Sequence, residues 1–248
     1  MKKLLVLVFI LIGIAVLGFI LIGRGKQASN VLNIGITDYP PLNYYENGKL
    51  VGFETEFAEE VCKELGMKPN FIQIDWGSKE VELKSKNIDA IWNGMTWTEE
   101  RSENMLLSDK YINNSGVLVV KKGTTDITSI AVEKGSQAET VADTDSFFTN
   151  KEIVKVDSMT KGFMEVASGN VTATYCDYVA AIGMLKGDGD YTNCEIWKGY
   201  TGKADQFAIG FRKDDTELCK KINNVMAEMK ADGRLKKIAD KYGLGDLL

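Results

Sequence analysis

The sequence predicts an α/β fold with two related lobes. Short apolar runs with a period of two alternate with amphipathic segments from residue 31 onward, a pattern typical of α/β layers with mostly parallel sheets. A fourteen-residue segment recurs once, which indicates two similar halves. Hydrophobic residues make up 44% and charged residues 26% of the 248 residues, and this globular composition argues against a disordered chain.

The predicted elements follow one another along the chain. Residues 31–37 alternate apolar and polar side chains, as a half-buried strand does. Residues 55–65 are predicted to be helical because Phe57, Val61 and Leu65 fall on one stripe, and Gly66 is a natural C-terminal stop. Further helices are predicted to open near 98 and 136 and to fill 216–242 with a break at Gly233. The remaining strands are predicted within 69–74, 88–92, 116–122, 129–135, 152–156, 171–176 and 207–213.

The recurring segment supports two similar lobes. Residues 81–94 align without gaps on residues 164–177, and both segments read as helix, turn and strand. The alignment places Gly94 and Asp177 at equivalent carboxyl ends of strands, where ligands bind in open α/β sheets. The identical pairs are Glu82 and Glu165, Ser85 and Ser168, Asn87 and Asn170, and Ala90 and Ala173.

The first 26 residues differ from the rest. Lys2 and Lys3 precede an uncharged apolar run of 19 residues, 4–22, which as a helix would reach roughly 28 Å, nearly a bilayer core. Signal-peptide cores of about 7–15 residues are typical, no small-residue cleavage site stands out, and the first cysteine is Cys62. We expect residues 1–26 to be an export signal or a membrane anchor, with the body outside. A buried core helix is disfavoured because the run has no polar face.

Several functional classes are excluded. The chain has no histidine, so Ser-His and Cys-His catalysis and His-ligated metal sites cannot form. A net charge of −5 argues against nucleic-acid binding. No nucleophile elbow, P-loop, dinucleotide fingerprint or metal-ligand cluster is present, and we therefore expect no catalytic residue, metal or cofactor. The spacing of Cys62, Cys176, Cys194 and Cys219 resembles neither a metal site nor a disulfide framework.

Two features near the first strands suggest a binding site. A loop with Tyr39, Tyr44 and Tyr45 follows the first strand, and its aromatic rings either wall a ligand or form a packed turn. Gly94 permits close approach of a ligand to the backbone, and Arg101 falls in the first turn of a helix that Thr96 or Thr98 would cap. Helix amides and a guanidinium suit a carboxylate; the alternative is a solvated surface arginine.

Two further features lie in the second half. Ser136 opens a helix after a strand, either as a simple cap or as part of a polar ligand site. Asp177 ends a strand and starts a helix, so it either caps that helix or opposes a ligand ammonium. Arg101 and Asp177 together would complement a zwitterion.

These motifs resemble the extracytoplasmic solute-binding proteins for polar amino acids (family 3), which are the receptors of ABC importers. The resemblance covers about 31–244. Its motifs are the aromatic-Pro loop with G-[FY]-[DE] at 39–54, N-I-D-A followed by G-M-T and an arginine at 87–101, S-D-x-Y at 108–111, V-x-x-G-[ST] at 132–136, the strand ending in Asp at 171–177, and G-F-R-K-D-D-T-E-L with the closing helices at 210–243.

The resemblance implies a two-lobed periplasmic-binding-protein-like fold of type II with two crossover strands as a hinge. It implies a first lobe of residues 31–112 and 207–248 and a second lobe of residues 113–206. The implied site residues are Arg101, Thr96 and Ser136 for the α-carboxylate, Gly94 and Asp177 for the α-ammonium, Tyr39 and Trp76 around the side chain, and Gln137 where many relatives have threonine. Basic-amino-acid binders often carry Asp at the position of Ile36, which counts against lysine or arginine without excluding them.

The implied function is that of a non-enzymatic receptor, a monomer in the periplasm or on the outer face of the cell membrane. Its partners would be an amino acid and the membrane subunits of an ABC importer. A dehydratase-like enzyme on the same fold is the first alternative, and it needs an acid in the cleft, for which Glu54 and Glu133 are candidates. A ligand-sensing domain that acts with a separate signalling partner is the second alternative.

Overall fold

The computed structural model describes residues 30–186 and 189–248. The predicted export signal or anchor at 1–26 lies outside these residues. Residues 31–248 form one compact unit. Across the described ranges, every helix is too short or too polar to cross a bilayer.

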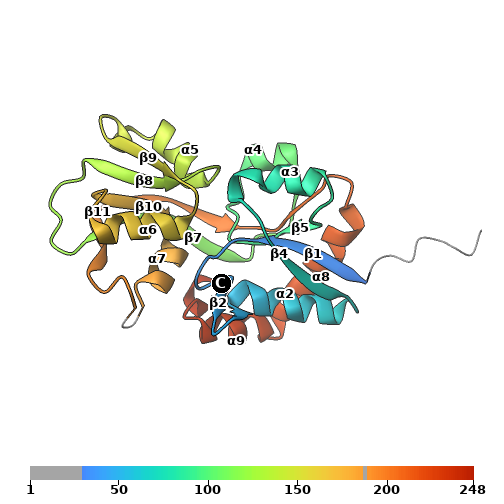
Figure 1. Ribbon diagram of the computed structural model, residues 1–248. Coiled ribbons are helices and arrows are strands. Elements are labelled where there is room, and N and C mark those ends of the chain that lie inside the picture. The colour runs from blue at the N-terminus through green and yellow to red at the C-terminus, as the bar shows by residue number, and fades with distance from the viewer. Residues whose placement is uncertain (1–29, 187–188) are drawn as a thin grey trace, which may run out of the picture. The chain divides into compact units, whose positions relative to one another are not determined.

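The first lobe is built on a five-stranded sheet in the order β4-β1-β5-β12-β6. β1 lies parallel to β4 and β5, whereas β12 runs antiparallel to its neighbours. The strands are β1 (Val31–Ile36), β4 (Lys68–Gln73), β5 (Ala90–Ile91), β6 (Leu106–Leu107) and β12 (Gly210–Phe211), beside the hairpin of β2 (Tyr44–Glu46) and β3 (Lys49–Val51). The helices are α2 (Phe53–Glu64), α3 (Lys79–Lys84), α4 (Glu99–Asn104), α8 (Thr216–Ala231) and α9 (Arg234–Lys241), with the short η1 (Trp76–Ser78) and η3 (Gly245–Leu247) (Figure 1).

The second lobe is built on another five-stranded sheet, in the order β11-β7-β10-β8-β9. β10, β8 and β9 are parallel, while β7 runs antiparallel to both of its neighbours. The strands are β7 (Ile112–Lys121), β8 (Ser129–Glu133), β9 (Glu152–Val156), β10 (Ala173–Asp177) and β11 (Cys194–Phe207). The helices are α5 (Gln137–Thr144), α6 (Met159–Ser168) and α7 (Tyr178–Met184), with the short η2 (Ser146–Phe148).

The chain passes between the two sheets twice. It enters the second lobe through β7 and returns through β11, and these two strands pair side by side with Phe207 opposite Ile112. This agrees with the predicted two-lobed fold and its paired crossover strands. The lobe boundaries at 112/113 and 206/207 stay a prediction, because residues 31–248 pack as one unit.

Each lobe has its own apolar core. In the first lobe the ring of Phe57 meets Trp92 edge-on at 5.0 Å between centroids, and both side chains are almost fully buried. In the second lobe Phe163 of α6 and Val119 of β7 are fully buried in one cluster. Aromatic pairs of this kind add about 0.5–1.5 kcal/mol beyond area burial. Cys62, Cys176, Cys194 and Cys219 are each free and buried.

The repeated segment adopts the same local structure twice. Asn87 Nδ2 donates to Glu82 Oε2 at 2.7 Å, and Asn170 Nδ2 donates to Glu165 Oε2 at 2.6 Å. The residue between helix and turn is left-handed in both copies, Lys86 with φ 64° and Gly169 with φ 84°. The identities noted in the sequence therefore preserve a helix-ending turn that delivers a strand to each sheet.

One predicted strand differs from the structure, and one observed strand was not predicted. The strand expected at 207–213 is split, because β11 ends at Phe207 and β12 covers only Gly210–Phe211. Between them the Ala208 N–H donates to the Met95 carbonyl, which diverts the chain into the first lobe. The long strand β11 was not expected before 207, because its mostly half-exposed residues lack an apolar alternation.

Candidate functional site

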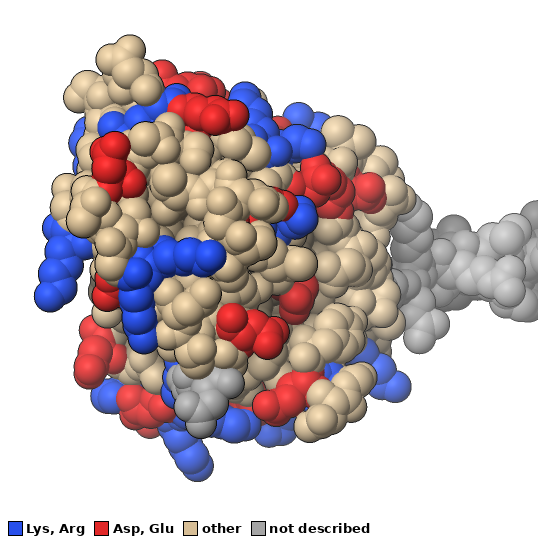
Figure 2. Space-filling view, turned by 60° about the vertical axis from the view of Figure 1, so that its left-hand side comes forward, with Lys and Arg blue, Asp and Glu red and all other residues tan. Residues whose placement is uncertain are grey.

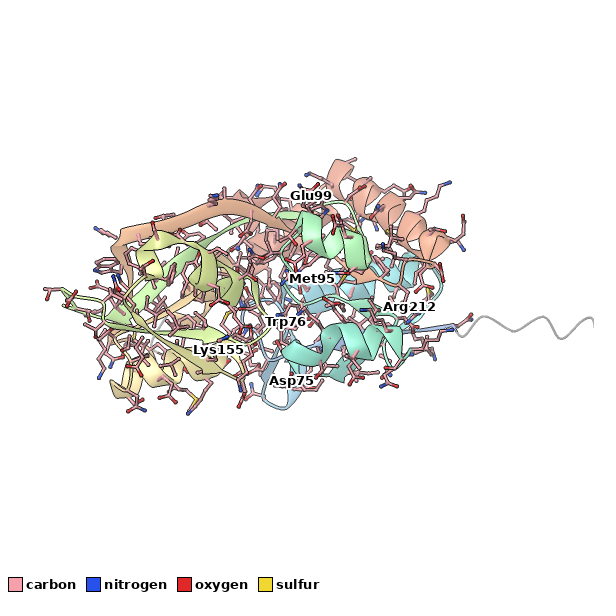
Figure 3. All side chains as sticks on the ribbon, turned by 90° about the horizontal axis from the view of Figure 1, so that it is seen from above. Asp75, Trp76, Met95, Glu99, Lys155 and Arg212 are labelled. Carbon is pink, nitrogen blue, oxygen red and sulfur yellow. The ribbon has the colours of Figure 1, made fainter. Side chains whose placement is uncertain are left out.

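A cavity lies between the two lobes, lined by residues of both. Trp76 lies where the two halves of the ribbon face each other (Figure 3). All eight predicted site residues line this cavity: Tyr39, Trp76, Gly94, Thr96, Arg101, Ser136, Gln137 and Asp177. The structure thus brings the eight residues together, and their roles in binding stay predictions.

Arg101 is held inside the cavity wall with most of its donors uncommitted. The Thr98 side chain caps α4 by accepting the Arg101 N–H at 3.1 Å. Arg101 Nη1 donates to the Thr96 carbonyl at 2.6 Å, and only 9% of the residue is exposed. Within the described residues no carboxylate forms an ion pair with it. Burial lowers its pKa, and the Asp177 charge opposes that effect. A guanidinium with free donors in a closed cavity suits a carboxylate.

Asp177 occupies the N-cap position of α7, but its side chain makes no capping hydrogen bond. Its carboxylate accepts from the Tyr39 hydroxyl at 2.6 Å and from Asn114 Nδ2 at 2.8 Å. Burial, and then the charge of Asp205, raises its pKa to about 7, while Tyr39 and Asn114 lower it. The helix-cap interpretation is therefore wrong for this side chain, which is free to oppose a cation.

The side chain of Asn114 in β7 caps α7 instead. Its Oδ1 accepts the Val179 N–H at 3.3 Å, inside the first turn of α7. Its Nδ2 donates to Asp177 at 2.8 Å and to Asp205 Oδ1 at 2.9 Å. Sequence reasoning missed Asn114, because a single asparagine in a strand gives no local sign of partners 63 and 91 residues away.

Gly94 is required where the wall approaches Tyr39. Its φ is +59°, and a Cβ there would lie 2.7 Å from Tyr39 Cε1, so a side chain would be strained and would clash. The Gly94 N–H donates to both oxygens of Glu54 at 3.0 and 3.1 Å.

Glu54 supports the wall from behind. Besides the Gly94 N–H, it accepts from Asn43 Nδ2 at 2.9 Å and from the Tyr111 hydroxyl. It is fully buried, and burial raises its pKa to about 7. It does not line the cavity. Of the two acids suggested for an enzymatic cleft, Glu54 is thus enclosed by the fold.

Two further ionisable residues, Glu133 and Lys79, lie at or near the cavity. Glu133 lines the cavity and is 8% exposed; burial, and then Asp177, raises its pKa to about 8. Lys79 Nζ donates to the carbonyls of Trp76 at 3.2 Å and Gly135 at 2.8 Å, and burial lowers its pKa to about 8. Sequence reasoning missed Lys79, because it stands in a charged segment that reads as a solvated helix.

Ser136 is a helix cap, which is the simpler of the two roles predicted for it. It caps α5 by accepting the Glu139 N–H at 3.3 Å, and its hydroxyl donates to the Glu133 carbonyl at 2.7 Å. It also lines the cavity beside Gln137, so a capping role and a place in the site coexist.

The arrangement suits binding more than catalysis. One buried guanidinium and one half-buried carboxylate line a cavity with aromatic walls, and these groups match the charges of a neutral zwitterion. Across residues 30–186 and 189–248, no group of three or more potential ligands could hold a metal ion.

Known proteins are similar to this chain over most of its length. A family model described as bacterial extracellular solute-binding proteins, family 3, matches residues 32–245. The L-cystine-binding protein TcyA of Bacillus subtilis is 31% identical over 264 residues, which cover 98% of this chain and 97% of that protein. The histidine-binding periplasmic protein of Salmonella typhimurium is 31% identical over 213 residues, or 79% and 80% of the two chains. Among solved structures, an ancestral arginine-binding protein bound to arginine has a TM-score of 0.80 and 32% identity, covering 86% of this chain and 98% of that one.

Proposed function

This chain belongs to the bacterial extracellular solute-binding proteins of family 3, and we propose that it binds a free amino acid between its lobes and delivers it to an ABC importer. Membership confirms the family predicted from the motifs. The relatives named above bind cystine, histidine and arginine by their names, which supports an amino-acid ligand here.

The observation that carries the proposal is the pairing of Arg101 with Asp177 in one cavity. Arg101 is buried and Asp177 is half-buried, and no ion pair joins them to each other or to another charged group of the described chain. Buried charges are costly without partners. An α-amino acid brings a carboxylate for Arg101 and an ammonium for Asp177, so it offsets both costs at once. Tyr39 and Trp76 are proposed to pack against its side chain, and Thr96, Gly94, Ser136 and Gln137 to contact its backbone groups.

Thermal unfolding of the purified protein against each of the twenty amino acids tests the proposal. A ligand at about 100 times its dissociation constant should stabilise the protein by about 2.7 kcal/mol. The α-amide and N-acetyl derivatives of the best ligand are the matched controls, because each removes one of the two charges. Failure of every amino acid to raise the unfolding midpoint would refute the proposal.

A dehydratase-like enzyme is the second candidate, and one observation favours it. Glu133 lines the cavity with its pKa raised to about 8, as a general acid requires. We infer a binding protein nonetheless, because the Arg101 and Asp177 pair would hold an intact amino acid. Incubation of the protein with the bound amino acid, followed by mass spectrometry of the ligand, separates the two functions. Release of water or ammonia from the ligand would favour the enzyme.

The setting of the protein is proposed from its family and its first residues. An extracytoplasmic receptor meets its importer at the membrane, and residues 4–22 are proposed to anchor the chain there. Acidic and basic side chains are interspersed over the face shown in Figure 2, which gives no support for nucleic-acid binding. The intact mass of membrane-fraction protein tests the anchor, since a shortened, freely soluble chain would refute it. Sedimentation of the body tests the proposed monomer.

A further inference from the structure

Glu133 is a third acidic or basic side chain in the cavity, and the proposed contacts to the α-groups do not use it. It ends β8 in the second lobe and is 8% exposed. We propose that Glu133 receives the cationic end of the ligand's side chain, so that the protein selects amino acids with a positive charge there. This inference rests on the proposed function and names its substrate class.

Glu133, Trp76 and Asp177 line the same cavity. A second cavity adjoins it and is lined by Asp177 but not by Glu133 or Trp76. A ligand whose ammonium meets Asp177 therefore has Trp76 and Glu133 within the same cavity for its side chain.

Glu133 lacks a counter-charge of its own. A backbone N–H from Met159 reaches its carboxyl, but no ion pair joins it to any described residue. The charged groups that act on it are Asp177, Lys79 and Asp75. Arg101 also lines this cavity, and the proposed function assigns its guanidinium to the ligand's α-carboxylate.

Lys79 does not fill the role of that counter-charge. Its Nζ is committed to the Gly135 and Trp76 carbonyls at 2.8 and 3.2 Å and lies 4.8 Å from the centroid of the Trp76 ring. Burial is the first cause that raises the pKa of Glu133 to about 8. A ligand cation would offset that penalty, and it would make binding release a proton near neutral pH.

This carboxylate answers an objection from the sequence. Ile36, buried at the end of β1, stands where basic-amino-acid binders of the family often have Asp. Glu133 supplies a carboxylate from the other lobe, so a basic ligand does not depend on position 36.

Titration calorimetry with ligand pairs that differ in side-chain charge tests the inference. L-arginine is compared with L-citrulline, which is nearly isosteric and uncharged, and L-lysine with L-norleucine, which lacks the ε-ammonium. We expect the wild-type protein to bind each charged member at least about tenfold more tightly, as for a hydrogen bond to a charged group. Glu133→Gln should weaken arginine binding roughly 10- to 100-fold and leave citrulline binding within about threefold. Glu152→Gln, which neutralises an exposed carboxylate of the same lobe, should change neither.

The pH dependence provides a second measurement. Arginine stays charged throughout, so the ratio of arginine to citrulline affinity should rise from pH 6 to pH 8 as Glu133 ionises. Taking the ratio cancels the titration of Asp177, which both ligands contact equally. Glu133→Gln should make the ratio independent of pH.

Three results would overturn the inference. They are equal wild-type affinities for arginine and citrulline, a Glu133→Gln variant that keeps the preference, and tightest binding of glutamate or aspartate, which would make Glu133 and Lys79 an anion site. Absence of binding by any of the twenty amino acids would refute the proposed function, and this inference with it. Citrulline binding by Glu133→Gln shows that the variant is folded.

Discussion

The hydroxyl of Tyr39 donates a 2.6 Å hydrogen bond to Oδ2 of Asp177, and it joins the first lobe to the second inside the cavity. The bond stabilises the ionised form of a carboxylate whose pKa burial raises to about 7. Tyr39 therefore favours the charged form of Asp177 that the proposed ammonium contact needs, besides forming part of the wall next to Gly94.

Tyr39→Phe should keep the wall and remove this hydrogen bond. The pKa of Asp177 would then rise further, so less of the carboxylate would be ionised at pH 7. We expect amino-acid affinity to fall about tenfold at pH 7 and to recover at pH 9. Calorimetry at both pH values measures the change. An equal loss at both would mean that the hydroxyl contacts the ligand directly.

Asp177→Asn should cause a large loss of affinity, because the ammonium would be buried without its counter-charge. That costs several kcal/mol. The asparagine offers only one acceptor to the two donors, Tyr39 and Asn114, so a small drop in the unfolding midpoint of the empty protein is also expected. Asp205→Asn is the matched control, since Asp205 bonds the same Asn114 amide but does not line the first cavity. Retained affinity in Asp177→Asn would move the ammonium site elsewhere.

Arg101→Ala should nearly abolish binding. Removing one partner of a buried charge pair costs about 3–5 kcal/mol, or roughly two to three and a half decades in affinity. The empty variant should unfold at the wild-type temperature or above it, because the guanidinium is buried without an ion pair. Arg101→Lys keeps the charge but loses the planar guanidinium, so its affinity should fall between those of the wild-type protein and Arg101→Ala. Unchanged affinity of either variant by calorimetry would refute the carboxylate assignment.

The empty protein should lose stability as pH rises from 5 to 8. Burial raises the pKa of Asp177 and Glu54 to about 7 and of Glu133 to about 8, so the folded protein binds more protons than the unfolded chain in this range. The stability that these three groups contribute is fully present below about pH 4, and it is lost as the pH rises through their raised pKa values. The chain has no histidine, so no side chain with an ordinary pKa titrates there. We expect the midpoint to fall by about 2–4 °C for each kcal/mol of stability lost, and calorimetric scans in several buffers measure the fall. A midpoint that rises with pH would contradict this account, and a saturating amino acid should reduce the fall.

Lys86→Gly should stabilise the protein. Lys86 is exposed and left-handed at φ 64°, where the second copy of the repeat has Gly169. A left-handed residue with a Cβ costs about 1–2 kcal/mol, partly offset by the greater entropy of glycine in the unfolded chain. We expect the free energy of unfolding to rise by about 0.5–1 kcal/mol, measured by urea denaturation. Gly169→Ala is the matched reverse change and should lower it by about 1 kcal/mol.

The features of the fold that could be predicted from the sequence are those that local residue patterns encode. The period of the apolar residues located most strands, and the repeat placed Gly94 and Asp177 at matching strand ends, which the shared Asn87 and Asn170 turns explain. The eight predicted site residues, which short motifs in a known order carry, line one cavity, and their roles in binding stay predictions.

What it missed depends on tertiary contacts. Asn114 and Lys79 owe their roles to partners in other elements, and neither residue type signals burial by itself. Glu54 was one of two candidates for the cleft acid that a dehydratase-like enzyme would need. The N–H of Gly94 and the hydroxyl of Tyr111 enclose it instead.

The branched bonding of Asn114 has a mechanical consequence. One amide links the crossover strands β7 and β11, through Asp205, to the ammonium site at Asp177 and to the start of α7. If Asp177 receives the ligand ammonium as proposed, the ligand's charge acts on the side chain that also bonds both crossover strands. Binding would then change the hydrogen bonding of the strands that connect the lobes.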